Sequence, residues 1–185
     1  MEETQSKLPT KYGLFDLYAF RTGEGEHLCL VKAPLPKNPL LRIHSECLTG
    51  DVFASQRCDC QSQLHASLKK IKKEGAGILI YLRQEGRGIG LFNKIRAYAL
   101  QDKGFDTVEA NEQLGFKADA RKYSIAIEIV KRFGITKVRL LTNNPDKVKS
   151  LAKEGIKVEQ IPLIILSPTT KKYLHTKKEK LGHLL

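Results

Sequence analysis

The fold class is decided by the stretch Ile78-Leu79-Ile80-Tyr81-Leu82-Arg83-Gln84-Glu85-Gly86-Arg87-Gly88-Ile89-Gly90. Its first five residues form an apolar run with the length and composition of a buried strand, and a glycine-punctuated loop follows. Upstream, apolar residues recur at helical spacing over residues 61–73. Downstream, a second helix is expected over residues 91–102, ended by Gly104. This succession of helix, strand, loop and helix predicts an α/β core.

The segments before this stretch are richer in strand signals. Residues 12–20 are interpreted as an alternating stretch typical of a strand, and a turn at residues 23–26 leads to an apolar run at residues 27–31, which together predict a hairpin. After three prolines, residues 40–44 are predicted to form a strand that enters a cysteine-rich region. The first third of the chain is therefore expected to be β-rich.

The segments after the stretch continue the alternation of helices and strands. A helix is expected over residues 122–133 and a strand over residues 138–142. Asn144 and Pro145 then suit the cap and the first position of another helix. We predict one α/β domain over residues 1–185, with a mixed β-sheet, flanking helices and a mobile C-terminal segment from about residue 171.

Three of the four cysteines, Cys47, Cys58 and Cys60, fall close together in the sequence. In a reducing compartment such clustering favours a metal site over a disulfide. If Cys58 and Cys60 lie on extended backbone, both sulfurs point to the same face and meet one ion. Three protein ligands leave a position for water, which is typical of catalytic zinc, whereas His44 or His65 as a fourth ligand would make the site structural.

Charge and hydropathy limit the possible partners. The formal net charge is +12, which favours an anionic partner without distinguishing a nucleotide from a nucleic acid. Lysines gather within residues 69–73 and 171–180, and we interpret both runs as solvated faces because no nucleic-acid-binding motif accompanies them. No apolar run is long enough to span a bilayer and no leader segment is evident. We expect a cytoplasmic protein that binds neither nucleic acid nor membrane.

Three further segments combine polar groups at the ends of predicted strands. The loop at residues 84–90 offers a carboxylate, a guanidinium and backbone amides, but it fits neither the dinucleotide fingerprint nor the P-loop, so a plain turn and a nucleotide site both stay open. Asp119 and Arg121 could equally form a surface ion pair. Helix capping explains Asn144, yet it leaves Thr142 and Lys147 available for phosphate.

Together these segments resemble the GTP cyclohydrolase II family. The resemblance is carried by residues 42–51, 57–60, 83–87, 93–98, 106–111 and 140–145, in the order of that family's motifs. It covers residues 40–163, whereas the first forty residues match loosely and leave Cys29 as a buried side chain without a role. Gln61 departs from the family pattern, in which glycine often follows the last cysteine.

The resemblance implies a role for eighteen residues. Cys47, Cys58 and Cys60 would hold one Zn²⁺ per chain, and Asp119, Arg121 and Tyr98 would be catalytic, with Asp119 as proton acceptor and Arg121 as nucleophile. A charged guanidinium is a poor nucleophile, so a phosphate clamp by Arg121 stays a rival role. The residues implied to contact GTP are Arg42, Ile43, His44, Ser45, Glu46, Gln63, Glu85, Gly86, Arg87, Thr107, Thr142 and Lys147.

The implied activity is the zinc-dependent opening of the guanine ring of GTP, with Mg²⁺ on the phosphates and release of formate and pyrophosphate at the start of riboflavin biosynthesis. The family also implies a homodimer. Two alternatives remain: a hydrolase of the same fold that leaves a formylated or triphosphate-retaining product, and a zinc-stabilised nucleic-acid-binding module. The presence of Tyr98, Asp119 and Arg121 argues against the first, and product analysis separates all three.

Overall fold

The computed structural model describes residues 1–165 and residue 182. The strands are β1 (Glu2–Thr10), β2 (Gly13–Thr22), β3 (Gly25–Lys32), β4 (Leu40–Ser45), β5 (Gly77–Leu82), β6 (Lys137–Leu141) and β7 (Lys157–Ile161). The helices are α1 (Leu48–Asp51), α2 (Cys60–Glu74), α3 (Gly90–Gln101), α4 (Thr107–Gln113), α5 (Ser124–Arg132) and α6 (Pro145–Lys153), with a short 3-10 turn, η1 (Glu85–Gly88).

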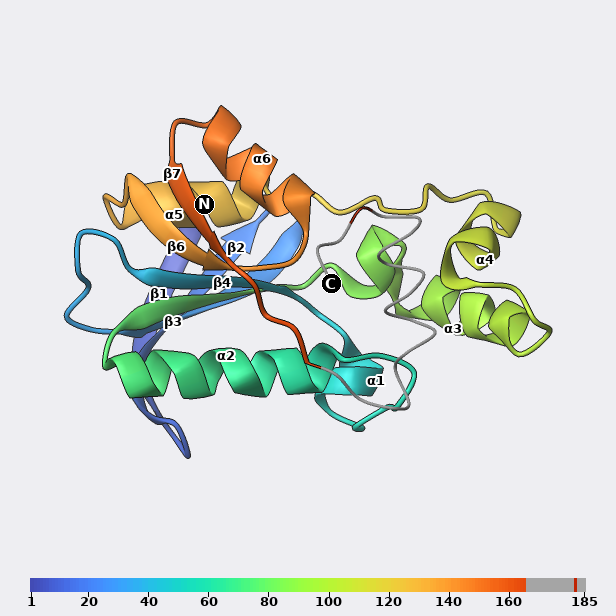
Figure 1. The fold of residues 1–185 in the computed structure, drawn as a ribbon, viewed down its shortest axis with the longest axis horizontal. Helices are drawn as coiled ribbons and strands as arrows, with labels where there is room; N and C mark the ends of the chain where they lie inside the picture. The colour runs from blue at the N-terminus through green and yellow to red at the C-terminus, as the bar shows by residue number, and fades with distance from the viewer. Residues whose placement is uncertain (166–181, 183–185) are drawn as a thin grey trace.

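The strands form one mixed sheet in the order β1-β2-β3-β5-β4-β6-β7. Figure 1 shows α2 along one face of this sheet and α5 and α6 on the opposite face. Helices α3 and α4 lie together beyond one end of the strands, on the far side of η1. This architecture confirms the predicted α/β class with a mixed sheet, flanking helices and a β-rich first third.

The N-terminal half of the sheet is antiparallel. Strands β2 and β3 form the predicted hairpin, in which Phe20 pairs with His27. Strand β1, which was not predicted, pairs with β2 along its whole length at the edge of the sheet. Its side chains are mostly exposed and polar, so it lacks the apolar alternation by which a half-buried strand is recognised.

The other half of the sheet is parallel and places three strand ends at one edge. Strand β4 lies between β5 and β6, with Leu41 opposite Ile78 on one side and Leu140 on the other. Parallel strands end at the same edge of a sheet, and open α/β sheets bind ligands beyond the carboxyl ends of their strands. The segments that follow Ser45, Leu82 and Leu141 therefore converge.

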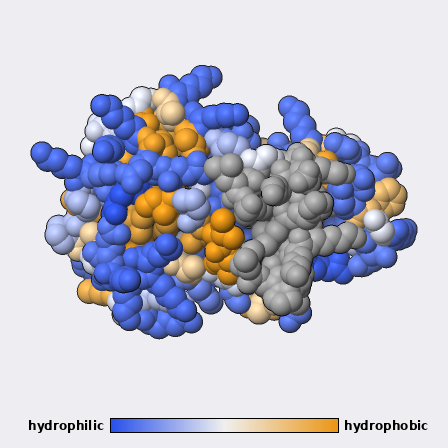
Figure 2. All heavy atoms as spheres, in the orientation of Figure 1, coloured by the Kyte–Doolittle hydropathy of each residue, from blue (hydrophilic) through white to orange (hydrophobic). Residues whose placement is uncertain are grey.

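Two hydrophobic clusters hold the helices to the sheet. The larger joins buried strand residues to α5 and α6, and it includes Cys29, which is completely buried as expected. The smaller joins Leu79 and Leu141 to Ile71 on α2. Burial of such side chains is the main favourable term in folding, at about 25 cal/mol per Å² of apolar surface. Figure 2 shows hydrophilic side chains over most of the visible surface.

Several predicted boundaries need correction. The helix expected over residues 122–133 begins later, at Ser124, because Arg121 and Lys122 belong to the irregular segment that precedes α5. Helices α1 and α4 and strand β7 were not predicted, since elements this short carry little periodicity. The segment from about residue 171 lies outside the described residues. No helix within residues 1–165 is both long and apolar enough to cross a bilayer.

The two-sided burial of β5 predicts a large effect for one leucine. Leu79→Ala is expected to lower the free energy of unfolding by about 2–5 kcal/mol, because the 1 % exposed side chain leaves a cavity between β5 and α2. Leu14→Ala removes the same atoms from a 56 % exposed strand position and should change it by less than about 0.5 kcal/mol. Urea titrations measure both, and equal losses would contradict this packing.

Candidate active site and metal centre

A pocket opens where β4, β5 and β6 end. It is lined by the segments that follow these three strands and by residues of α2, α3, α4 and α6. Its lining contains every residue with a predicted role except Ile43 and Asp119: Arg42, His44, Ser45, Glu46, Cys47, Cys58, Cys60, Gln63, Glu85, Gly86, Arg87, Tyr98, Thr107, Arg121, Thr142 and Lys147. The tertiary structure thus gathers segments that are separated by more than a hundred positions in the sequence, as Arg42 and Lys147 are.

Three sulfur atoms lie together at one side of the pocket. The Sγ atoms of Cys47, Cys58 and Cys60 all fall within 4.8 Å of one another, and those of Cys47 and Cys58 are 3.6 Å apart. Cys47 caps α1, and Cys60 is the first residue of α2. Thiolates at such separations can bind one metal ion, and three of them leave a coordination position for another ligand.

The local backbone of this cluster differs from the expectation. Cys58 and Cys60 do not lie on extended backbone, because Asp59 forms a bend and Cys60 already belongs to α2. A turn that enters a helix brings the two sulfurs together instead. Neither suspected histidine joins them: the His44 ring faces Asp51, and the His65 ring lies 6.1 Å from that of Tyr12. Gln61 continues regular helix, so its departure from the family pattern leaves the backbone undisturbed.

Gly50 provides the room that the sulfur cluster needs. A Cβ atom at this position would lie 2.9 Å from Cys58 Sγ, 3.1 Å from Cys47 Sγ and 3.2 Å from Cys60 Cβ. These distances are shorter than ordinary van der Waals contacts, and Gly50 is buried within α1. The absence of a side chain at Gly50 therefore allows the three cysteines to converge.

Asp51 anchors the backbone beside Cys47. Its carboxylate accepts hydrogen bonds from the Cys47 amide at 3.1 Å and from the Tyr81 hydroxyl at 2.8 Å, and it faces His44 Nε2 at 3.1 Å. Burial lowers the pKa of His44, although its hydrogen bond to Asp51 opposes the shift, so the ring is neutral near pH 7. These contacts attach the cysteine segment to β4 and β5.

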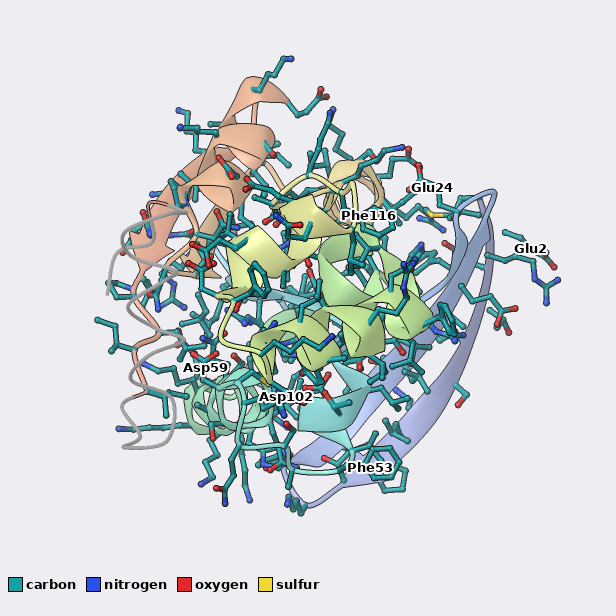
Figure 3. All side chains as sticks on the ribbon, turned by 90° about the vertical axis from the view of Figure 1, so that its right-hand side faces the viewer. Glu2, Glu24, Phe53, Asp59, Asp102 and Phe116 are labelled. Carbon is teal, nitrogen blue, oxygen red and sulfur yellow. The ribbon has the colours of Figure 1, made fainter. Side chains whose placement is uncertain are left out.

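Tyr98 on α3 contacts the same short helix, α1, that contains Asp51. Its hydroxyl is 3.2 Å from Thr49 Oγ1, which is itself 3.8 Å from Cys47 Sγ. The Arg57 guanidinium lies 4.8 Å from the centre of the Tyr98 ring and donates to Asp102 at 2.6 Å. Burial raises the pKa of Tyr98, so its hydroxyl keeps its proton. Figure 3, turned so that α3 and α4 face the viewer, labels Asp102 at the end of α3.

The glycine-rich loop forms a tight turn against the segment that precedes α5. Gly86 and Arg87 both have positive φ angles, of 62° and 61°, and the Arg87 carbonyl accepts from the Ala120 amide at 3.1 Å. A Cβ atom at Gly88 would lie 3.0 Å from the Ala120 carbonyl oxygen. Arg87 Nη2 is buried without a hydrogen-bond partner among the described residues. Such a donor at a pocket wall is suited to a polar ligand.

Buried cations line the floor of the pocket. The Arg42 guanidinium donates to the Leu141 carbonyl at 3.0 Å and to Gln63 Oε1 at 2.6 Å, and burial lowers its pKa to about 10, which leaves it charged near neutral pH. Lys147, in the first turn of α6, donates to the Ile43 carbonyl at 2.8 Å. Thr142 Oγ1 accepts from the Asn144 amide at 3.0 Å. This concentration of positive charge favours an anionic ligand.

Asp119 and Arg121 form a half-buried pair rather than an exposed ion pair. Arg121 Nε donates to both carboxylate oxygens, at 2.9 and 3.0 Å, and Nη2 donates at 2.5 Å. Burial favours the neutral acid, but the hydrogen bonds and charge of Arg121 outweigh it and lower the pKa of Asp119. Only Arg121 reaches the pocket lining, so Asp119 lies behind it.

Some pocket residues were not predicted, and besides Asp119 one other predicted residue lies outside the pocket lining. The Ile43 side chain is completely buried in the larger hydrophobic cluster, so only its backbone is near the pocket. The lining includes unpredicted polar residues, among them Arg57, Lys94, Asn111 and Asn143. Lys94 carried a signal, because it lies within the motif at residues 93–98, but a lysine on a helix is usually solvated.

Comparison with known proteins places the chain in a family. The family model described as GTP cyclohydrolase II matches residues 1–162. A GTP cyclohydrolase-2 of Helicobacter pylori (strain Shi470) is 53% identical over 98% of this chain and 96% of its own, and that of Helicobacter acinonychis is 52% identical with the same coverage. The riboflavin biosynthesis protein RibBA of Bacillus velezensis is 53% identical over 99% of this chain and 48% of its own.

The fold and site define an α/β protein with a cluster of three cysteines, close enough together to hold one metal ion, inside a cationic pocket. Within that class, the chain belongs to the GTP cyclohydrolase II family. The match begins at residue 1, so the expectation that the resemblance starts near residue 40 was too narrow.

The contacts around Gly50 predict a specific defect in metal binding. Gly50→Ala is expected to reduce zinc affinity about tenfold or more, because the added methyl group displaces the sulfurs of Cys47 and Cys58. Gly23→Ala is a matched control, since nothing lies within 4 Å of a Cβ atom there. Zinc content after dialysis against a metal buffer measures the effect. Normal zinc retention by Gly50→Ala would show that this crowding does not matter.

Proposed function

We propose that this chain catalyses the zinc-dependent hydrolysis of GTP to formate, pyrophosphate and 2,5-diamino-6-(5-phospho-ribosylamino)pyrimidin-4(3H)-one, the first step of riboflavin biosynthesis. The observation that carries this proposal is the cluster of three sulfurs in the wall of a pocket whose floor is cationic. Membership of the GTP cyclohydrolase II family and the names of its relatives support the same activity. Two C–N bonds at C8 of guanine and one P–O bond are broken, each with uptake of one water molecule.

The residues fit the zinc ion that this activity requires. Cys47, Cys58 and Cys60 would hold it, and Gly50 leaves their sulfurs unobstructed. The donor set of three sulfurs suits zinc better than Mg²⁺, which prefers oxygen ligands. When bound, a zinc ion with three protein ligands supplies Lewis acidity and lowers the pKa of water toward neutrality.

The rest of the pocket would bind GTP with its guanine toward the sulfur cluster. The cationic side chains Lys147, Arg42 and Arg121 support binding of the triphosphate, together with Mg²⁺. Thr142 and Lys147 lie at the end of β6 and the start of α6, where a helix N-terminus favours anions. The remaining proposed contacts are the residues at positions 42–46, Gln63, the turn at residues 85–87 and Thr107.

Tyr98, Asp119 and Arg121 are the proposed catalytic residues. The Tyr98 hydroxyl lies near the sulfur cluster and retains its proton, so it is suited to move protons beside the guanine ring. Asp119 is ionised and contacts Arg121 Nε, which suits a proton acceptor for that guanidinium. After this transfer, Arg121 would attack the α-phosphate and displace pyrophosphate, and water would then hydrolyse the N–P bond to release the nucleotide and free Arg121. While it stays charged, it would act as a phosphate clamp with water as the attacking group.

The wider setting of the enzyme is proposed on the same basis. We assign a single domain over residues 1–185, a cytoplasmic location and a homodimer, with no nucleic-acid or membrane partner. The family match over residues 1–162 supports one functional unit. Size measurement by light scattering at several protein concentrations tests the dimer independently of catalysis.

The principal test compares two cysteines with different surroundings. Purified protein incubated with GTP and Mg²⁺ should release formate and pyrophosphate together, and Cys58→Ala should abolish formate because it removes a metal ligand. Cys29→Ala, at a buried position in β3, should retain the activity. Mass spectrometry of the nucleotide product identifies the reaction. Ring opening by Cys58→Ala, or a product that keeps its formyl group, would refute the proposed function.

A second test addresses the ion pair between Asp119 and Arg121. Asp119→Asn is expected to slow pyrophosphate release by about 10²–10⁴-fold, because the amide cannot accept a proton from Arg121. Because the pKa of Asp119 is lowered, its carboxylate stays ionised near neutral pH. Wild-type activity should therefore be lost only as the pH falls through that lowered value and the carboxylate takes up a proton. The control is Asp16→Asn, which alters the ion pair between Asp16 in β2 and Lys7 in β1. Undiminished pyrophosphate release by Asp119→Asn would remove Asp119 from the mechanism.

A further inference from the structure

A buried lysine contacts the sulfur cluster from α3. Lys94 is 8 % exposed, and its Nζ atom lies 3.1 Å from Cys47 Sγ and 2.8 Å from Glu85 Oε1. Burial of an ammonium group is unfavourable unless the charge is paired and hydrogen-bonded. The Glu85 carboxylate and the Cys47 sulfur supply the pairing that a buried ammonium at this position requires.

Glu85 connects this ammonium to the backbone beside the cluster. Its Oε2 atom accepts a hydrogen bond from the Leu48 amide at 2.6 Å, and its Oε1 atom accepts from the Gly86 amide at 2.7 Å as well as from Lys94. Leu48 directly follows Cys47 in the chain. The carboxylate thus joins the turn after β5 to the segment that carries the first cysteine, and Lys94 bridges the same two parts through its side chain.

The net charge of the cluster, once a metal ion is bound, explains why a cation beside Cys47 would matter. Three thiolates and one divalent cation carry a net charge of −1, and the cluster lies in a partly buried pocket where charges are weakly screened. The Lys94 ammonium, which donates to the Glu85 carboxylate at 2.8 Å and to Cys47 Sγ at 3.1 Å, offsets part of the excess negative charge of the thiolates.

We propose that Lys94 is a positioning residue of the metal centre, whose ammonium, shared between Glu85 and Cys47, controls how strongly the Cys47 sulfur donates to the metal. This inference rests on the proposed metal centre. A cation that donates N–H to a thiolate draws electron density from the sulfur, which leaves the bound metal a stronger Lewis acid. Glu85 determines how much of the ammonium reaches the sulfur, since both groups hold the same Nζ atom.

The experiment uses the full-length protein loaded with Co²⁺ in place of zinc. Absorption from thiolate-to-cobalt charge transfer reports the electron density on sulfur without any need for catalysis. Lys94→Met preserves the approximate length of the side chain but removes the donor, so the band should move to lower energy. Glu85→Gln leaves the ammonium to Cys47 alone, so the band should move to higher energy.

Lys131→Met is the matched control. Lys131 pairs with Glu154 at the same 2.8 Å separation, but its side chain is 49% exposed and lies on α5, away from the cluster. The charge-transfer band and the Co²⁺ affinity of this variant should equal those of the wild type. A general effect of losing a lysine–glutamate pair would instead appear in both lysine variants.

Shifts of opposite sign separate control of the sulfur from simple support of the fold. An unchanged band in Lys94→Met, or shifts in the same direction in both pocket variants, overturns the inference. If Lys94→Met does not fold, Glu85→Gln decides alone, and any result other than a shift to higher energy overturns it. Absence of a thiolate-to-cobalt band in the wild-type protein refutes the metal centre as well. A normal band that is unchanged by both substitutions refutes only the role of Lys94.

Discussion

The parallel pairing of β4 with β5 and β6 is the constraint on which the site depends. Because Leu41 lies opposite both Ile78 and Leu140, the three strands run toward the same edge of the sheet, and each is followed directly by a segment of the pocket. A slip of one residue would turn the side chains of β4 to the opposite face of the sheet. Arg42 and His44 would then leave the pocket side. The pairing is maintained by apolar side chains that are buried on both faces.

The site combines a rigid sulfur cluster with a network of buried charges. Cys47 is held through its amide by Asp51 and through its sulfur by Lys94, while Gly50 leaves space between the cysteines. Buried ionic groups cost stability unless they are paired, so their concentration here is better explained by chemistry than by folding. Across the pocket, Arg121 is oriented by Asp119 before any substrate arrives. Such preorganisation lowers the reorganisation required during reaction.

The sequence predicted the elements with strong periodicity and failed where periodicity is weak. The alternation at residues 12–20 and the apolar run from Ile78 to Leu82 correspond to β2 and β5, whereas β1 was missed because its exposed edge residues are polar. The clustering of the cysteines indicated a metal site, but the extended backbone proposed for Cys58 and Cys60 was wrong. Spacing constrains which atoms can meet, and several backbone conformations satisfy the same spacing.

The sequence by itself determined the α/β class, the cysteine cluster and the family motifs, because hydrophobic periodicity, clustering and motif order are local properties of the chain. The tertiary structure alone decided that Lys94 faces Cys47 and Glu85, that the Ile43 side chain belongs to the core, and that Asp119 lies behind Arg121. The first of these facts depends on which face of α3 packs toward the sheet edge, and the other two depend on the burial of β4 and on the path of the segment before α5. Contacts between distant segments are selected by the packing of the whole domain, and no local pattern encodes them.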